Sequence, residues 1–160
     1  RTDISVINLE WLQNEAYRSR IVSSLGIRYT GKVIGDESNW IRSCQSSDKA
    51  LYFANSIPPK ALQASSGQLY CTGLAFKLSV KQYNNIKILE SNWTSFDKKE
   101  MFEHSASGDA LKANYIFGLL QLYNHYKLTN QTKSSTYLKA IQKIGKIANK
   151  TAIVEQLIND

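Results

Sequence analysis

The stretch Gln68-Leu-Tyr-Cys-Thr-Gly-Leu-Ala-Phe-Lys-Leu-Ser-Val-Lys81 decides the fold that the sequence predicts. From Tyr70 to Val80, every second position is bulky, and the positions between hold small or polar residues. Successive side chains of a strand point to opposite faces, so this period of two predicts a long β-strand with one bulky face. We therefore expect the middle of the chain to be rich in β structure.

Four shorter strands are predicted on either side of the long one. Residues 28–34, 39–44 and 50–54 precede it and residues 86–92 follow it, with turn-forming residues between them. Pro58-Pro59 breaks the chain before a short helical stretch at residues 60–64. The order is three strands, a helical connection, a long strand and a last strand.

This order resembles that of the OB-fold family, and its glycines resemble the anticodon-binding-like branch of that family. The pieces that carry the resemblance are Tyr29-Thr-Gly-Lys-Val33 and Gly67-Gln-Leu-Tyr-Cys-Thr-Gly73. The resemblance covers about residues 28–93. It implies a small five-stranded antiparallel β-barrel, in which glycine allows a strand to coil sharply.

Helices are predicted on both sides of the barrel. Leu9, Leu12 and Ala16 recur at helical spacing in a helix over about residues 8–24, which Gly26 ends. Beyond residue 96 the pattern is helical, and residues 107–120 resemble the first helix of a tetratricopeptide-type hairpin, which implies an antiparallel helix pair packed on the barrel. The predicted fold class is therefore α+β. Its expected domains are an N-terminal helix over 1–27, an OB-like barrel over 28–95 and a C-terminal helical segment over 96–160.

The positive charge of the chain is compatible with several classes of partner and does not select one of them. Its 160 residues carry a formal net charge of +7, mostly from lysine, and no apolar run is long enough to span a membrane. Such a basic surface suits nucleic acid or an anionic glycan, although it is equally typical of a solvated surface. Because the chain begins with Arg1 and a removed leader leaves no trace, we expect a secreted or periplasmic protein, with the cytoplasm as the alternative.

No residue pattern indicates catalysis, so we expect a non-enzymatic protein without metal or cofactor. The cysteines Cys44 and Cys71 form either one disulfide, which would support export, or two buried thiols. Glu100, Glu103 and His104 lie close together, but a solvated helix face explains them as well as a metal site does. A weaker alternative is a hydrolase that uses His104 or His125.

Two binding surfaces are candidates. OB barrels bind through the face of their second and third strands and through two loops, which the resemblance carries onto Trp40, Arg42, Tyr52, Lys81 and Tyr83. Barrel core is the alternative for Trp40. The second surface is one face of a C-terminal helix, where four lysines lie within a narrow arc, although a solvated face explains this pattern equally well. They are Lys139, Lys143, Lys146 and Lys150.

The function that these features predict is a non-enzymatic binding module that engages a protein partner, in an exported or cell-envelope setting. The alternative is binding of single-stranded nucleic acid or oligosaccharide on the barrel face, where aromatic side chains beside cations would stack on bases or sugars.

Overall fold

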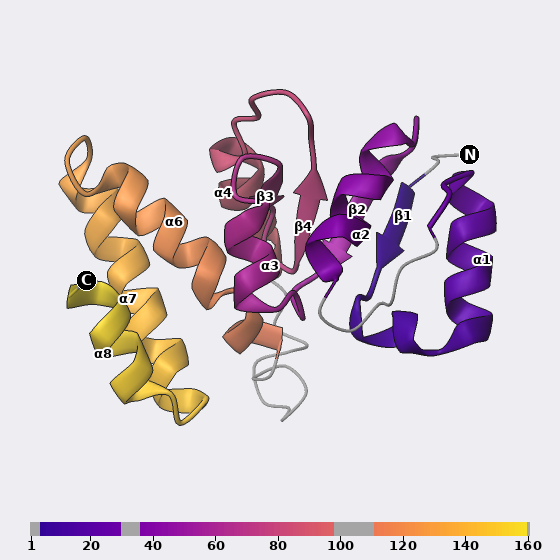
Figure 1. Cartoon of the computed structure of the whole chain (residues 1–160). Coiled ribbons are helices and arrows are strands. Elements are labelled where there is room, and N and C mark those ends of the chain that lie inside the picture. The colour runs from indigo at the N-terminus through magenta and orange to yellow at the C-terminus, as the bar shows by residue number, and fades with distance from the viewer. Residues whose placement is uncertain (1–3, 30–35, 98–110, 160) are drawn as a thin grey trace. The chain divides into compact units, whose positions relative to one another are not determined.

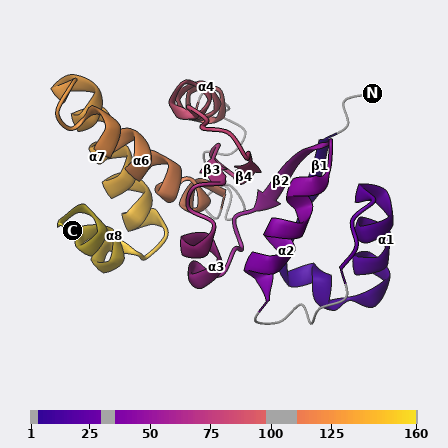
Figure 2. The same cartoon turned by 45° about the horizontal axis from the view of Figure 1, so that its top comes forward.

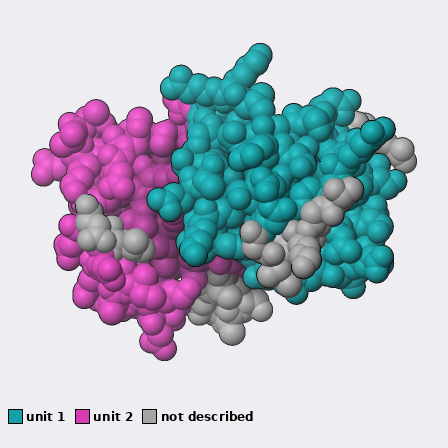
Figure 3. Space-filling view, viewed as in Figure 1, with its two compact units in different colours: residues 1–70, 75–83 teal, residues 71–74, 84–160 magenta. Residues whose placement is uncertain are grey.

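The computed structural model describes residues 4–29, 36–97 and 111–159 (Figure 1). The contacts within the chain divide it into two compact units, which are coloured separately in Figure 3. Unit 1 contains residues 1–70 and 75–83, and unit 2 contains residues 71–74 and 84–160. The chain therefore passes into unit 2 for four residues, returns to unit 1, and passes into unit 2 again.

Unit 1 is built on a four-stranded sheet with the order β1-β2-β4-β3. The strands are β1 (Ile4–Ile7), β2 (Ala50–Ala54), β3 (Leu69–Cys71) and β4 (Ala75–Leu78). β1 is parallel to β2, and β4 is antiparallel to β2. The register places Ile7, Phe53 and Phe76 side by side across the sheet, and all three are buried, so this row forms the core face.

The helices of unit 1 lie on one side of this sheet, as Figures 1 and 2 show. A 3-10 turn, η1 (Glu10–Gln13), leads into α1 (Glu15–Leu25), and a second, η2 (Cys44–Ser46), follows α2 (Glu37–Ser43). The short α3 (Pro59–Ala64) begins at a proline. α1 ends where the sequence predicts, because Gly26 adopts the left-handed conformation with φ of 64°.

Unit 2 is helical. It contains α4 (Ile86–Asp97), α6 (Ile116–Tyr126), α7 (Gln131–Ile147) and α8 (Thr151–Asn159). The short connection between α6 and α7 makes them an antiparallel pair (Figures 1 and 2). The apolar faces of these helices supply the core of the unit, which includes Leu89, Leu119, Leu122, Ile141, Ile144 and Val154.

The four residues 71–74 are tied to unit 2 by close contacts. Asn85 donates a hydrogen bond to the Cys71 carbonyl, and Asn92 donates one of 2.7 Å to the Thr72 carbonyl. Gly73 has a φ of 115° and lies against the Tyr115 ring, where an added Cβ would meet ring atoms at 2.6 Å. Only glycine fits this backbone conformation and this contact without strain.

The predicted OB barrel is wrong, because the sheet is open, mixed and four-stranded. Residues 39–44, predicted as a strand, lie mostly in α2. Trp40, Ile41 and Cys44 are all buried, at spacings of one and three residues. A helix can bury such a set on one face, whereas a strand would turn Trp40 and Ile41 to opposite faces.

Two other predicted strands differ from the structure. Residues 86–92 belong to α4, whose inner face carries Leu89 and Trp93 at helical spacing, and the alternation of Ile86 and Ile88 was misleading. The long strand over 68–81 is divided into β3 and β4 at Gly73, because its left-handed backbone interrupts the pleat. The strand predicted at 50–54 is confirmed as β2.

These corrections remove the basis for the resemblance to the OB-fold family. The predicted strand at 28–34 falls largely outside the described residues, as does the stretch around residues 98–110. The helix pair of α6 and α7 exists, but the described residues form no barrel on which it could pack. Binding of nucleic acid or oligosaccharide to a barrel face therefore loses the surface on which it was predicted. Across the described ranges, no helix combines the length and the apolar character needed to cross a membrane.

Candidate functional site

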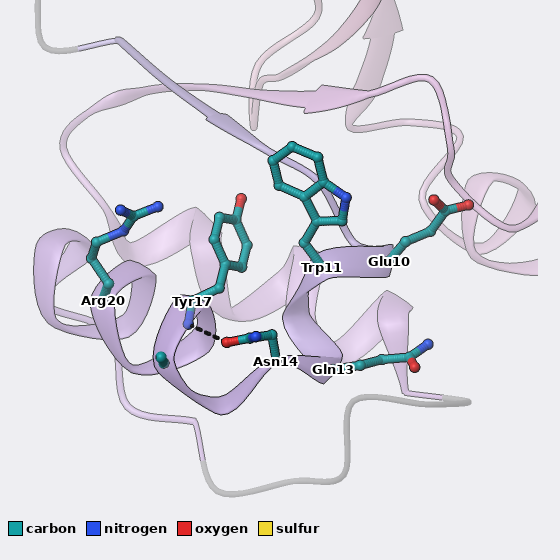
Figure 4. Close-up of a pocket in the computed structure, with 7 residues that line it drawn as sticks. Glu10, Trp11, Gln13, Asn14, Tyr17 and Arg20 are labelled. Carbon is teal, nitrogen blue, oxygen red and sulfur yellow. Dashed lines mark hydrogen bonds between the residues drawn. The ribbon is translucent and has the colours of Figure 1, made fainter.

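A surface hollow of unit 1 lies where η1 meets α1, and we call it the Trp11 hollow. Its volume is about 670 Å³ (Figure 4). Buried Leu9 and Leu12 anchor η1 in the core, so the intervening Trp11 points outward and is 61% exposed. The lining consists of two aromatic rings, two charged groups, two amides and one methyl group. These belong to Glu10, Trp11, Gln13, Asn14, Ala16, Tyr17 and Arg20.

Hydrogen bonds hold the Trp11 hollow in one conformation. The Asn14 side chain caps α1 by accepting from the Tyr17 backbone N–H at 3.0 Å, the bond drawn in Figure 4. The Tyr17 hydroxyl accepts from the Asn8 backbone N–H at 3.2 Å, which fixes the far end of the ring. Trp11 and Tyr17 meet edge to face with ring centroids 5.8 Å apart. The aromatic wall is therefore preorganised.

Charges of opposite sign flank the two rings. Figure 4 shows Arg20 on the Tyr17 side of the hollow and Glu10 on the Trp11 side. The Arg20 guanidinium lies 5.6 Å from the centroid of the Tyr17 ring, a cation–π contact that orients it. Within the described part of the chain neither Arg20 nor Glu10 forms an ion pair, so both charges remain available to a ligand.

A second hollow continues from the first. It has a volume of about 370 Å³ and shares Glu10 and Gln13 with the Trp11 hollow. Its other lining residues come from the start of α2 and from the segment before α3, and they are Leu9, Glu37, Ser56, Ile57, Pro58 and Pro59. The two hollows meet at Glu10 and Gln13, and we call them together the Trp11 groove. Arg20 lines the first hollow, Glu10 lies where the hollows meet, and Glu37 lines the second.

The residues predicted as a barrel face are dispersed. Trp40 is fully buried in α2, whereas Arg42 is exposed on the same helix. Tyr52 and Tyr83 are brought near each other by Lys77: Tyr52 pairs with Lys77 across β2 and β4, and the Lys77 ammonium lies 4.1 Å from the Tyr83 ring centroid. Lys81 is exposed and lines a separate hollow.

Three of the four lysines predicted to share a helix face lie on α7, and Lys150 lies between α7 and α8. All four, Lys139, Lys143, Lys146 and Lys150, are exposed. Ile141 and Ile144 on the other side of α7 are buried. The structure is thus consistent with the simple alternative of a solvated helix face.

A polar cluster joins α4, α6 and α7 within unit 2. The Glu90 carboxylate accepts from the Lys133 ammonium and from the Tyr137 hydroxyl, each at 2.9 Å. Burial would raise the pKa of Glu90, but the hydrogen bonds from Lys133, Tyr137 and Tyr126 outweigh it and lower the pKa below its ordinary value of 4.5. We interpret this cluster as a structural link between helices.

The two cysteines are free, buried thiols. Burial raises the pKa of Cys44 to about 12. Burial also raises the pKa of Cys71 to about 11, although the contact of its sulfur with the Gly73 carbonyl opposes the rise. A thiol with so high a pKa is a poor nucleophile at neutral pH. The disulfide considered from the sequence is not formed in this structure.

Other predicted chemistry has little support in the structure. His104, Glu100 and Glu103 lie outside the described residues. His125 is exposed near the end of α6, with its ring edge-on to Tyr126. Among the described residues, no group of three or more His, Cys, Asp or Glu side chains could hold a metal ion.

Sequence reasoning missed the Trp11 groove because it placed Trp11 inside one long helix over residues 8–24. A signal was available, since Trp11 falls off the face defined by Leu9 and Leu12. No protein-family model matches the chain, and comparisons with curated proteins and with solved structures find no match. The geometry of the groove therefore carries the functional argument.

Proposed function

We propose that this chain is a non-enzymatic binding module and that the Trp11 groove holds an extended segment of a protein partner. The observation that carries the proposal is the exposed Trp11 beside a fixed Tyr17 and beside Arg20, which forms no ion pair with any described residue. Tryptophan, tyrosine and arginine are the residues most enriched among those that dominate binding energy at protein interfaces. Covering the exposed part of Trp11 would contribute about 3 kcal/mol.

The charges of the groove define the chemistry of the partner segment. Arg20 in the first hollow favours an acidic residue, and Glu10 where the two hollows meet favours a basic residue. An apolar side chain between them would lie against the rings of Trp11 and Tyr17. Two connected hollows offer more contact to an extended segment than to a compact group. An exported or cell-envelope setting remains a prediction, and the free thiols remove the disulfide that motivated it.

The experiment is site-specific photo-crosslinking followed by affinity measurement. A photoreactive phenylalanine analogue replaces Trp11 in one sample and Leu128 in the other. Leu128 is a matched control because it is a large apolar residue, 95% exposed, in unit 2. Cells of the source organism are illuminated, and the partner captured from position 11 is identified and purified.

Binding of the purified partner is then measured by calorimetry. We expect Trp11→Ala to weaken the affinity roughly 30-fold or more, Arg20→Ala to weaken it less, and Leu128→Ala to leave it unchanged. Equal capture from positions 11 and 128, or wild-type affinity of Trp11→Ala, would refute the proposal.

A further inference from the structure

A smaller hollow in unit 1 lies where the segment after α2 meets the end of β4. Its volume is about 230 Å³. Gln45, Ser47 and Lys49 line it from one segment, and Ser79 and Lys81 line it from the other. We call it the Lys49 pocket. It shares no lining residue with the Trp11 groove.

The Lys49 pocket carries two positive charges and no negative one. None of the residues that line it is acidic. The Lys49 ammonium donates one hydrogen bond of 2.8 Å to the Ser24 carbonyl, which anchors it and leaves two of its three N–H groups for other acceptors. Lys81 is exposed, and within the described ranges its ammonium pairs with no carboxylate. Two uncompensated ammonium groups at one hollow favour an anionic ligand.

A serine hydroxyl adds to this bias. The Ser47 hydroxyl oxygen accepts from the Lys49 backbone N–H at 3.3 Å, so its own hydrogen remains free to donate. The Ser79 hydroxyl donates to the Lys81 carbonyl at 2.9 Å, so its hydrogen is already engaged. The donors that can reach a ligand in the pocket are therefore the two ammonium groups and the Ser47 hydroxyl.

The remaining lining is apolar, and it narrows the class of anion. Leu78 and Val80 supply hydrocarbon surface beside the donors, whereas Leu51 is only 2% exposed. The pocket contains no arginine, the side chain that most often recognises phosphate through paired hydrogen bonds. We propose that the Lys49 pocket binds the carboxylate of a ligand with a short branched apolar group, with the carboxylate at Lys49 and Lys81 and the apolar group at Leu78 and Val80.

The test is a titration of the full-length, isotope-labelled chain with 3-methylbutanoate, followed by ¹H–¹⁵N NMR at constant low ionic strength. We expect saturable shifts of the Gln45 side-chain amide and of the Ser47 and Ser79 backbone amides. The neutral analogue 3-methylbutanamide has nearly the same shape without the charge, so it should produce no saturable shift.

Lys81→Met tests the charge without disturbing the anchored Lys49. We expect it to weaken 3-methylbutanoate binding roughly tenfold or more, because it removes a charge-assisted hydrogen bond. Lys60→Met removes an exposed lysine on α3 of the same unit, outside the pocket, and should leave the affinity unchanged. The inference is overturned if shifts fail to saturate, if the amide analogue binds equally well, or if Lys81→Met retains wild-type affinity.

Two sources of the carboxylate are then separated. A tripeptide that ends in valine is compared with its C-terminally amidated form and with 3-methylbutanoate. Tighter binding of the free-ended tripeptide assigns the pocket to a chain terminus, and tighter binding of 3-methylbutanoate assigns it to a free organic acid. Trp11→Ala should not affect this titration, so failure here and failure of the proposed protein-binding function are distinguishable.

Discussion

The packing of α8 on α7 predicts that Gly145→Ala destabilises the wild-type protein but stabilises a protein that already carries Val154→Ala. Gly145 of α7 lies against buried Val154 of α8, and a Cβ added at Gly145 would meet the Val154 Cγ2 atom at 2.9 Å. Replacing glycine by alanine within a helix contributes about 1 kcal/mol of stability. Forcing a methyl group into a packed contact costs about 2 kcal/mol. Gly145→Ala should therefore destabilise the protein by about 1 kcal/mol.

The same change should stabilise a chain that already carries Val154→Ala. That substitution removes two buried methyl groups and costs about 2–3 kcal/mol. In this background the Cβ at 154 remains 3.3 Å from the added Cβ, a contact that a shift of a few tenths of an ångström relieves. The alanine at 145 therefore keeps the gain of about 1 kcal/mol from helix propensity and buries a methyl group worth about 0.8 kcal/mol. The two effects of Gly145→Ala differ by about 2.5–3 kcal/mol, which is the coupling energy of the pair.

The assay is urea unfolding of the four variants, followed by far-ultraviolet circular dichroism at 222 nm. Gly67→Ala is the control, because an added Cβ there meets no atom within 4 Å, and it should change the free energy of unfolding by less than about 0.5 kcal/mol. Stabilisation by Gly145→Ala in the wild-type background, or an equal effect in both backgrounds, would refute the packing argument.

Four further predictions concern side chains already described. Glu90→Gln should destabilise unit 2 at pH 7, as measured by urea unfolding at several pH values. Because the pKa of Glu90 is lowered in the folded state, the stability difference between wild type and variant should be largest above pH 4.5. It should disappear as the pH falls through the folded pKa. Tyr137→Phe should cost about 1 kcal/mol in the same assay, since it removes one hydrogen bond to Glu90. Cys44 and Cys71 should react with a thiol reagent only after unfolding and without added reductant, and unreactive unfolded protein would indicate a disulfide. The pair Lys139→Ala and Lys143→Ala should change stability by less than about 0.5 kcal/mol, because both side chains are solvated, and a larger loss in urea unfolding would contradict their exposure.

The helices could be predicted from the sequence better than the sheet. Gly26 and the apolar spacing of α7 are local signals, and both gave elements close to those observed. The pairing of β1 with β2 joins Ile4 to Ala50, and no local pattern reports such a long-range partner. The sequence analysis missed β1 itself, because a parallel strand forms only with a partner that lies far away in the sequence.

Burial distinguishes the two tryptophans Trp40 and Trp11. The OB resemblance carried Trp40 onto the barrel face, with the core as the alternative, and its position beside Ile41 and Cys44 places it in the core. Trp11 has the same chemistry and is exposed, and this difference depends on which neighbouring residues the fold buries. The alternation of bulky and small side chains continues through Gly73, although the strand breaks there. A pattern of side chains carries no information about the left-handed backbone of Gly73.

The four residues 71–74 have a consequence for synthesis on the ribosome. The chain emerges from its N-terminus, so these residues are complete long before Asn85 and Tyr115, with which they interact in unit 2. Unit 1 has all its residues once position 83 has emerged, and it can fold around a loop whose partners are not yet made. We expect unit 1 to fold first during translation and to offer this loop as the site on which the later helices assemble. A circular permutant that begins at residue 84 would be translated in the opposite order.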